Sequence, residues 1–148
     1  MEQIDLNKRY QTMLTLWFAL LMSVGMYFVF LLLSNPPFNT EQRTQAQSIL
    51  IVVLTMMGAI LVGLSFLVKK TFIESSVDKQ DVSLVQKGMI AACAMCEVSA
   101  LLGLIERLVI GYRGYYLLFL FAAGGMLLHF PRRSQLEAAA FRSGNRTF

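Results

Sequence analysis

The chain has 148 residues, of which 56% are hydrophobic and only 15% are charged, with a formal net charge of +4. Soluble domains carry about 25% charged residues, and so small a soluble core cannot hide long uncharged runs. The composition therefore excludes an ordinary soluble domain and predicts an integral membrane protein whose main partner is the lipid bilayer. Nucleic-acid binding is not expected, because no basic, aromatic-rich soluble segment accompanies the positive charge.

Four apolar segments follow one another along the chain, and we expect each to form a transmembrane helix. The first three meet the length of roughly 20 residues that a helix needs to cross a bilayer, whereas the fourth is shorter and begins with a tyrosine pair suited to the headgroup region. The expected helices are residues 13–33, 49–68, 88–110 and 113–130. The predicted fold is an all-α membrane protein, with residues 1–148 forming a single membrane domain.

The polar connections between these segments indicate how the helices begin and end. The paired prolines at 36–37 end the first helix, and Asn39 or Thr40 is the expected N-cap of the second. The loop 69–87 keeps apolar residues, so we expect both flanking helices to extend into it and meet in a tight turn near 78–80. The tail 131–148 is basic and then Ala-rich, which predicts a short surface helix within it.

Lysine and arginine residues concentrate on one side of this four-helix arrangement. That side contains both termini and the loop 69–87, and its cations are Lys8, Arg9, Lys69, Lys70, Lys79, Lys87, Arg132, Arg133, Arg142 and Arg146. Positive charge is enriched on the cytoplasmic side of membrane proteins. We therefore expect a multi-pass protein of the cell (inner) membrane with both termini and this loop in the cytoplasm.

Glu97 is the residue that most strongly suggests a function, because it lies near the middle of the third apolar segment. Placing an acidic residue at the bilayer centre costs about 2.5–3.5 kcal/mol, and such residues generally mark ion or proton pathways. A carboxyl that is neutral in hydrocarbon and ionised beside water can carry protons. The alternative is that a protonated Glu97 only holds helices together, with Thr55, Ser65 and Ser99 as candidate hydrogen-bond partners.

Small residues recur at intervals of three and four along the same helix, which places them on one face. We expect this stripe to serve helix packing, with Glu97 at its edge. Its members are Gly88, Ala92, Cys96, Ser99 and Gly103.

The remaining polar residues of the apolar segments suggest no enzyme, metal site or cofactor. Cys93 and Cys96 have the spacing of a redox pair, but an apolar helix disfavours the thiolate, so we interpret them as small packing residues. Glu106 and Arg107 are expected to pair or to snorkel to the interface, and His129 to form hydrogen bonds at headgroup level. No nucleophile or cofactor loop accompanies them, and we expect no catalytic activity.

One stretch of the chain resembles a known family. The run DKQDVSLVQKGMIAACAMCEVSALLGLI (Asp78 to Ile105) is similar to the loop and second helix of subunit c, the proteolipid of rotary ATP synthases, and MMGAILVG (56–63) to its first helix. The resemblance covers about residues 49–110 and implies a subunit-c-like helical hairpin formed by helices two and three. It places Glu97 at the ion-carrying carboxylate.

The resemblance also implies which ion Glu97 binds. Val98 stands where sodium-binding relatives offer a hydroxyl, so a proton is the expected ion. The chain departs from the family pattern by retaining only Gly58 and Gly63 of its glycine run, by Asp81 in place of the turn proline, and by two additional helices. These departures favour a divergent relative over a working rotor ring.

Three functions follow from these observations. The first is a proton-binding or proton-translocating membrane protein that uses Glu97, with self-association or membership of a larger membrane complex. The second is a non-transporting structural or assembly component of such a complex. The third is a small proton-coupled exporter, in which Glu97 would line a substrate cavity together with aromatic residues.

Overall fold

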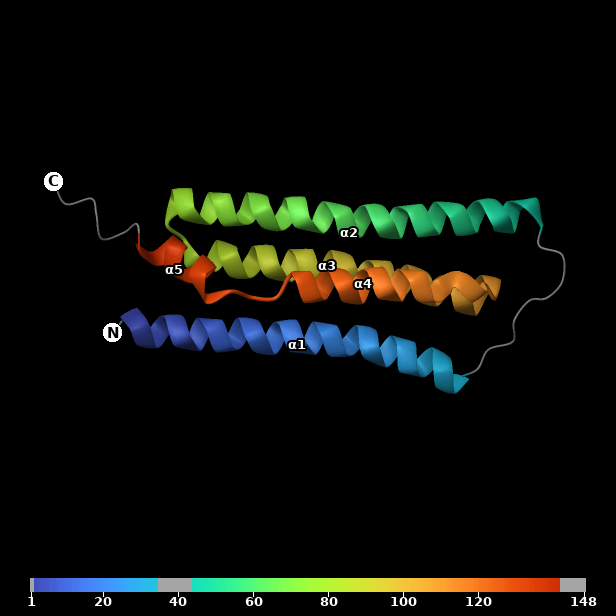
Figure 1. Cartoon of the computed structure of the whole chain (residues 1–148), viewed down its shortest axis with the longest axis horizontal. Helices are drawn as coiled ribbons and strands as arrows, with labels where there is room; N and C mark the ends of the chain where they lie inside the picture. Colours follow the sequence, from blue (N-terminus) through green and yellow to red (C-terminus); the bar gives the residue numbers. More distant parts are fainter. Residues whose placement is uncertain (1, 35–43, 142–148) are drawn as a thin grey trace.

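The computed structural model describes residues 2–34 and 44–141, and this part of the chain is all-helical (Figure 1). Four longer helices carry most of the residues. The helices are α1 (Glu2–Ser34), α2 (Gln45–Lys79), α3 (Val82–Ile105), the π-helix η1 (Glu106–Ile110), the 3₁₀ helix η2 (Arg113–Tyr115), α4 (Tyr116–Leu128) and α5 (Arg133–Phe141). The expected all-α class is confirmed.

Helix α3 is the central helix of the bundle and contacts α1, α2 and α4. Half of its most apolar stretch is buried, against 17% of the corresponding stretches of α1 and α2. Those two helices direct large apolar side chains outward, and the exposed fraction reaches 81% at Leu33 and 61% at Val52. A surface of this kind suits a hydrocarbon environment better than water.

Three helices are long and apolar enough to cross a membrane: residues 6–34, 45–79 and 82–110. A fourth crossing arises only if residues 113–128 and 133–140, which meet at a bend of 48°, are taken as one span. Helix α4 has 13 residues, a length of about 20 Å, and this falls short of the ~30 Å of bilayer hydrocarbon. The structure thus gives three candidate spans where the sequence predicts four.

Two helix starts are formed by side-chain capping. Thr44 caps α2, where its hydroxyl accepts from the backbone N–H of Gln47 and the Gln47 side chain accepts in return from the Thr44 N–H. Asn39 and Thr40, the expected caps, lie outside the described residues. Asp81 caps α3 by accepting from the N–H of Ser83 at 2.9 Å.

Helices α2 and α3 run antiparallel and side by side, and the chain reverses at Gln80 and Asp81. Gln80 has φ 53°, in the left-handed region that ends many helices. The sequence predicts this turn at 78–80, within a residue or two of its position in the structure.

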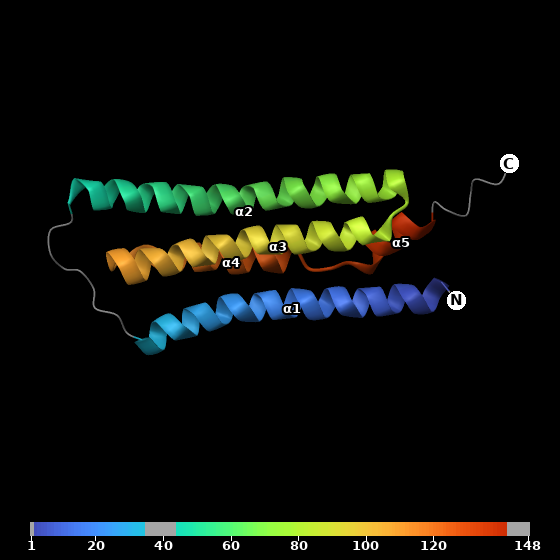
Figure 2. The same ribbon diagram turned by 180° about the vertical axis from the view of Figure 1, so that it is seen from behind.

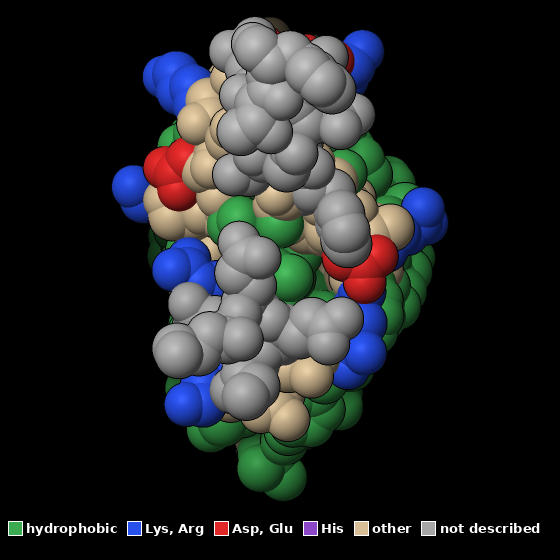
Figure 3. Space-filling view, turned by 90° about the vertical axis from the view of Figure 1, so that its left-hand side faces the viewer, with side chains coloured by type: hydrophobic (Ala, Val, Ile, Leu, Met, Phe, Trp, Pro, Cys, Tyr) green, Lys and Arg blue, Asp and Glu red, His purple; other side chains and the backbone are tan. Residues whose placement is uncertain are grey.

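The start of α1, the α2–α3 turn and α5 all lie at one end of the bundle, as opposite views show (Figures 1 and 2). Lysine and arginine side chains surround this end, which we call the basic end (Figure 3). Helix α5 closes it: Leu136 and Ala139 are buried against a cluster that includes Met13, Trp17 and Met89. The expected surface helix of the tail is therefore also a packing element.

Candidate functional site

Glu97 lies on the face of α3 that packs against α1 and is half-buried there. Its Oε1 accepts a hydrogen bond from the Ser23 hydroxyl at 2.6 Å and another from the Tyr27 hydroxyl at 3.0 Å. Ser23 and Tyr27 are four residues apart on α1, and this spacing places both side chains on one helix face. The carboxyl therefore meets two hydroxyl groups within an otherwise apolar helix contact.

The Ser23 hydroxyl has a second neighbour, the backbone carbonyl of Leu20 at 2.7 Å. A serine hydroxyl carries one hydrogen and two lone pairs. When Glu97 is ionised, Ser23 donates to the carboxylate; when Glu97 is protonated, the acid donates to Ser23 and Ser23 donates to Leu20. Both protonation states of Glu97 are thus satisfied without a change in side-chain position.

The hydrogen-bond partners of Glu97 differ from the three that the sequence suggests. Thr55 donates to Glu106 at 2.9 Å, and Ser65 donates to the carbonyl of Val62 at 2.6 Å. The Ser99 hydroxyl is buried and has no hydrogen-bond partner among the described residues. The physical reason is the direction of each side chain around the α3 axis. Cys96 faces Ser65 of α2, and the next residue, Glu97, points about 100° away and meets α1 instead.

The sequence does not identify Ser23 and Tyr27 as partners of Glu97, because it does not show which helix packs against which face of α3. A usable signal was present, since two hydroxyl residues four positions apart in an apolar helix mark a polar patch.

The small-residue stripe is buried, and its glycines allow close helix contacts. A Cβ added at Gly88 would lie 2.5 Å from the Cβ of Phe72 on α2. One added at Gly103 would lie 3.0 Å from the Cβ of Leu118 and 3.1 Å from the carbonyl of Tyr115. This face therefore packs α3 against α2 and α4, while the adjacent face presents Glu97 to α1.

A second buried carboxyl lies where α3 widens into the π-helix η1. Glu106 is 1% exposed and Arg107 is 2% exposed, so neither side chain snorkels to the surface, which was one of the two expectations for them. Glu106 accepts from Thr55, and the Arg107 guanidinium lies 5.7 Å from the centre of the Tyr115 ring. A π turn changes the direction of side chains relative to a regular helix, which accounts for the inward placement.

His129 follows α4 and is 1% exposed, so it lies inside the bundle near its basic end, and its depth in a bilayer stays a prediction. Its Nε2 lies 2.8 Å from the Ser65 hydroxyl. The same hydroxyl donates to the Val62 carbonyl at 2.6 Å, an arrangement in which its lone pairs can accept from Nε2. The thiol of Cys96 also donates to Ser65, at 3.6 Å.

The cysteines and histidine do not combine into a metal centre. Cys93 and Cys96 are both free and buried. In the part of the chain that the structure describes, no three His, Cys, Asp or Glu side chains are grouped to hold a metal ion.

Comparison with known proteins adds no relative. No family model, no curated protein and no solved structure matches this chain.

Proposed function

We propose that this chain is a small integral membrane protein in which Glu97 binds and releases a proton. The observation that carries the proposal is the placement of its carboxyl against Ser23 and Tyr27, in the middle of a helix long and apolar enough to span a bilayer. Intramembrane carboxyls are costly and generally serve ion or proton transfer. Hydroxyl partners that serve both the acid and the carboxylate lower the cost of changing between them.

The proposed membrane arrangement has four crossings, the last made by α4 together with its flanking residues. The exposed apolar faces of α1 and α2 support insertion into lipid. The basic end supports a cytoplasmic position for the N-terminus, the α2–α3 turn and α5 in a cell (inner) membrane.

A divergent relationship with subunit c of the rotary ATP synthases belongs to the same proposal. The antiparallel pair α2 and α3, with Glu97 midway along α3, is consistent with such a hairpin. In this chain α1 covers the carboxyl, so we propose that the proton is exchanged through the hydroxyls of α1. Native mass spectrometry of the detergent-extracted protein tests self-association, and a ring of many copies would favour the closer relationship.

Carbodiimide labelling tests the proton site directly, because these reagents attack protonated carboxyls in apolar surroundings. Purified protein is treated over a pH series, and the modified peptide is mapped by mass spectrometry. Mapping must separate Glu97 from Glu106, which is also buried. We expect labelling at Glu97 that falls as pH rises, its loss in Glu97→Gln, and its retention in Glu106→Gln. Absence of label at Glu97, or label that is independent of pH, contradicts the proposal.

The second candidate is a structural or assembly component that moves no protons. The observation in its favour is that the bonds from Ser23 and Tyr27 join α1 to α3, a sufficient structural role for the carboxyl. Glu97→Gln separates the two functions, because glutamine still accepts hydrogen bonds but does not titrate. Under the structural function, this variant should assemble, co-purify with its complex and support growth as the wild type does.

A further inference from the structure

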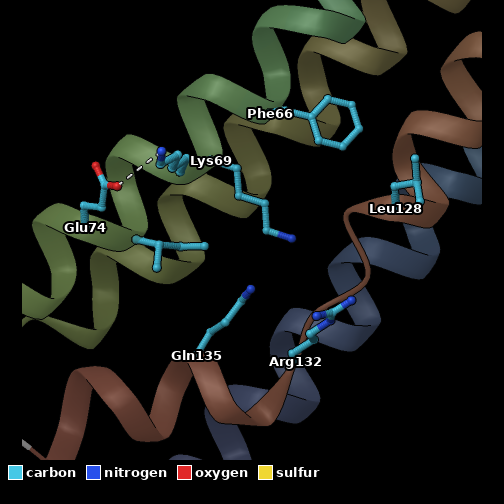
Figure 4. A pocket seen from close by; sticks show the side chains of 8 residues that line it. Phe66, Lys69, Glu74, Leu128, Arg132 and Gln135 are labelled. Carbon is cyan, nitrogen blue, oxygen red and sulfur yellow. Dashed lines mark ion pairs between the residues drawn. The ribbon is translucent and has the colours of Figure 1, made fainter.

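A cavity of about 390 Å³ opens at the basic end, between α2 and the segment that joins α4 to α5 (Figure 4). This volume lies within the usual range for small-molecule sites. The side chains of Lys69, Arg132 and Gln135 converge on the cavity from these two parts of the chain. The cavity is separate from Glu97 and takes no part in the proposed proton binding.

The cavity has an excess of positive charge. Its one carboxylate, Glu74, pairs with Lys70 at 3.8 Å on the rim. Lys69 and Arg132 have no carboxylate partner within residues 6–34 and 44–141, and both line the same cavity. Two neighbouring cations without a counter-ion form a favourable site for an anion.

Three side chains supply hydrogen-bond donors at this site, and a hydrogen bond orients one of them, Lys69. Lys69 donates one hydrogen bond to the backbone carbonyl of His129 at 3.2 Å, which leaves two of its three N–H groups for a ligand. Arg132 presents a planar guanidinium, which matches two oxygens of a phosphate group. The amide of Gln135 adds a third donor from the first turn of α5.

The opposite wall of the cavity is apolar and continues onto the outer surface of the bundle. Phe66 and Leu128 line it, and they are 40% and 70% exposed. A ligand that fills this site therefore combines an anionic head with an apolar body, and a free phosphate ion would leave the apolar wall uncovered.

We propose that this cavity binds the headgroup phosphate of an anionic phospholipid, with Lys69 and Arg132 contacting the phosphate and the acyl chains lying along Phe66 and Leu128. Basic pockets between helices on the cytoplasmic side recognise such headgroups. The inference rests on the membrane location proposed above and not on the proton role of Glu97.

The test is native mass spectrometry of the full chain in detergent, with phosphatidylglycerol or phosphatidylcholine added at equal concentration. The wild type should retain phosphatidylglycerol in preference to phosphatidylcholine. The double variant Lys69→Gln, Arg132→Gln should bind phosphatidylglycerol about twenty-five-fold more weakly, from about fivefold for each cation. The control Lys79→Gln, Lys87→Gln removes the same charge from the same end outside the cavity and should keep the preference.

Two further variants keep the test independent of folding. Arg132→Gln alters an exposed side chain, so it should fold and weaken binding about fivefold. Lys69→Arg keeps the charge and should keep binding.

Three outcomes overturn the inference. An equal loss of phosphatidylglycerol binding in the Lys79→Gln, Lys87→Gln variant would assign the effect to general surface charge. No preference for phosphatidylglycerol in the wild type would remove the lipid site. Complete displacement of the lipid by excess inorganic phosphate, with no contribution from the acyl chains, would assign the cavity to a free anion.

The failure of the proposed function would look different. Glu97→Gln should leave lipid binding unchanged, so a negative labelling experiment at Glu97 does not affect this inference. Recovery of the protein in the soluble fraction of cells would instead contradict the membrane location on which both proposals depend.

Discussion

The Ser23 hydroxyl lies 2.6 Å from Oε1 of Glu97 and so joins α1 to α3 across 74 positions of the chain. With the Tyr27 hydroxyl at 3.0 Å, it gives the carboxyl two donors from a single helix face. The contact is polar where the surrounding helix surfaces are apolar. The contact is therefore both the candidate proton site and a pair of hydrogen bonds that hold α1 against α3.

Coupling between Tyr27 and Glu97 can be measured by a double-mutant cycle. Tyr27→Phe should lower the free energy of unfolding in detergent by about 0.6–1.7 kcal/mol, the range for hydrogen bonds between membrane helices. The same substitution in a Glu97→Leu background should have almost no effect, because the acceptor is absent. Tyr116→Phe, at a half-exposed tyrosine of α4, is the control. An equal loss of unfolding free energy on Tyr27→Phe in the wild-type and Glu97→Leu backgrounds would contradict the hydrogen bond.

Close packing at Gly88 predicts a large effect of one added methyl group. A Cβ there would lie 2.5 Å from the Cβ of Phe72, an atom held by the α2 backbone, so the two helices would have to separate. We expect Gly88→Ala to lower the free energy of unfolding by about 1–3 kcal/mol. The thermal unfolding midpoint should fall accordingly.

Gly63→Ala is the matched control on α2, because a Cβ at Gly63 meets no atom within 4 Å. It should leave stability unchanged or raise it by up to about 1 kcal/mol through helix propensity. Similar effects of the two substitutions would argue against close packing of α3 on α2 at Gly88.

Two buried serines should respond in opposite ways to the same substitution. Ser65→Ala removes the hydrogen-bond partner of His129 Nε2, a buried nitrogen, and should cost about 1–3 kcal/mol in free energy of unfolding. Ser99→Ala removes a buried hydroxyl with no partner among the described residues and should be neutral or stabilising. A larger loss for Ser99→Ala than for Ser65→Ala would contradict the assigned contacts.

Asp81 predicts an acid-dependent contribution to stability at the start of α3. Hydrogen bonds from Ser83 hold the pKa of this carboxyl below its ordinary value. Its stabilising contribution is therefore complete above the unfolded-state pKa of about 3.9 and is lost as pH falls through the lower folded-state pKa. Asp81→Ser keeps an N-cap that does not titrate, so its unfolding midpoint should change less with pH in this range. An identical acid response in both proteins would contradict the prediction.

Helix class and the approximate position of each helix could be predicted because hydropathy and capping are local properties of the chain. The α2–α3 turn lies within a residue or two of its predicted place, and a helix forms in the tail where an Ala-rich segment predicts one. The number of spans differs from the four that the sequence predicts, because α4 is short and only three of the described helices are long enough alone. Whether a short apolar segment crosses a bilayer depends on its neighbours as well as its own length.

From the sequence alone, the all-helical class, the long apolar segments and the placement of Glu97 within one of them could be determined, because each depends on residues adjacent in the chain. Only the tertiary structure decided that Glu97 meets Ser23 and Tyr27, that Glu106 and Arg107 turn inward, and that His129 is buried against Ser65. These contacts depend on how each helix is rotated about its axis. That rotation is set by packing between helices that lie far apart in the sequence.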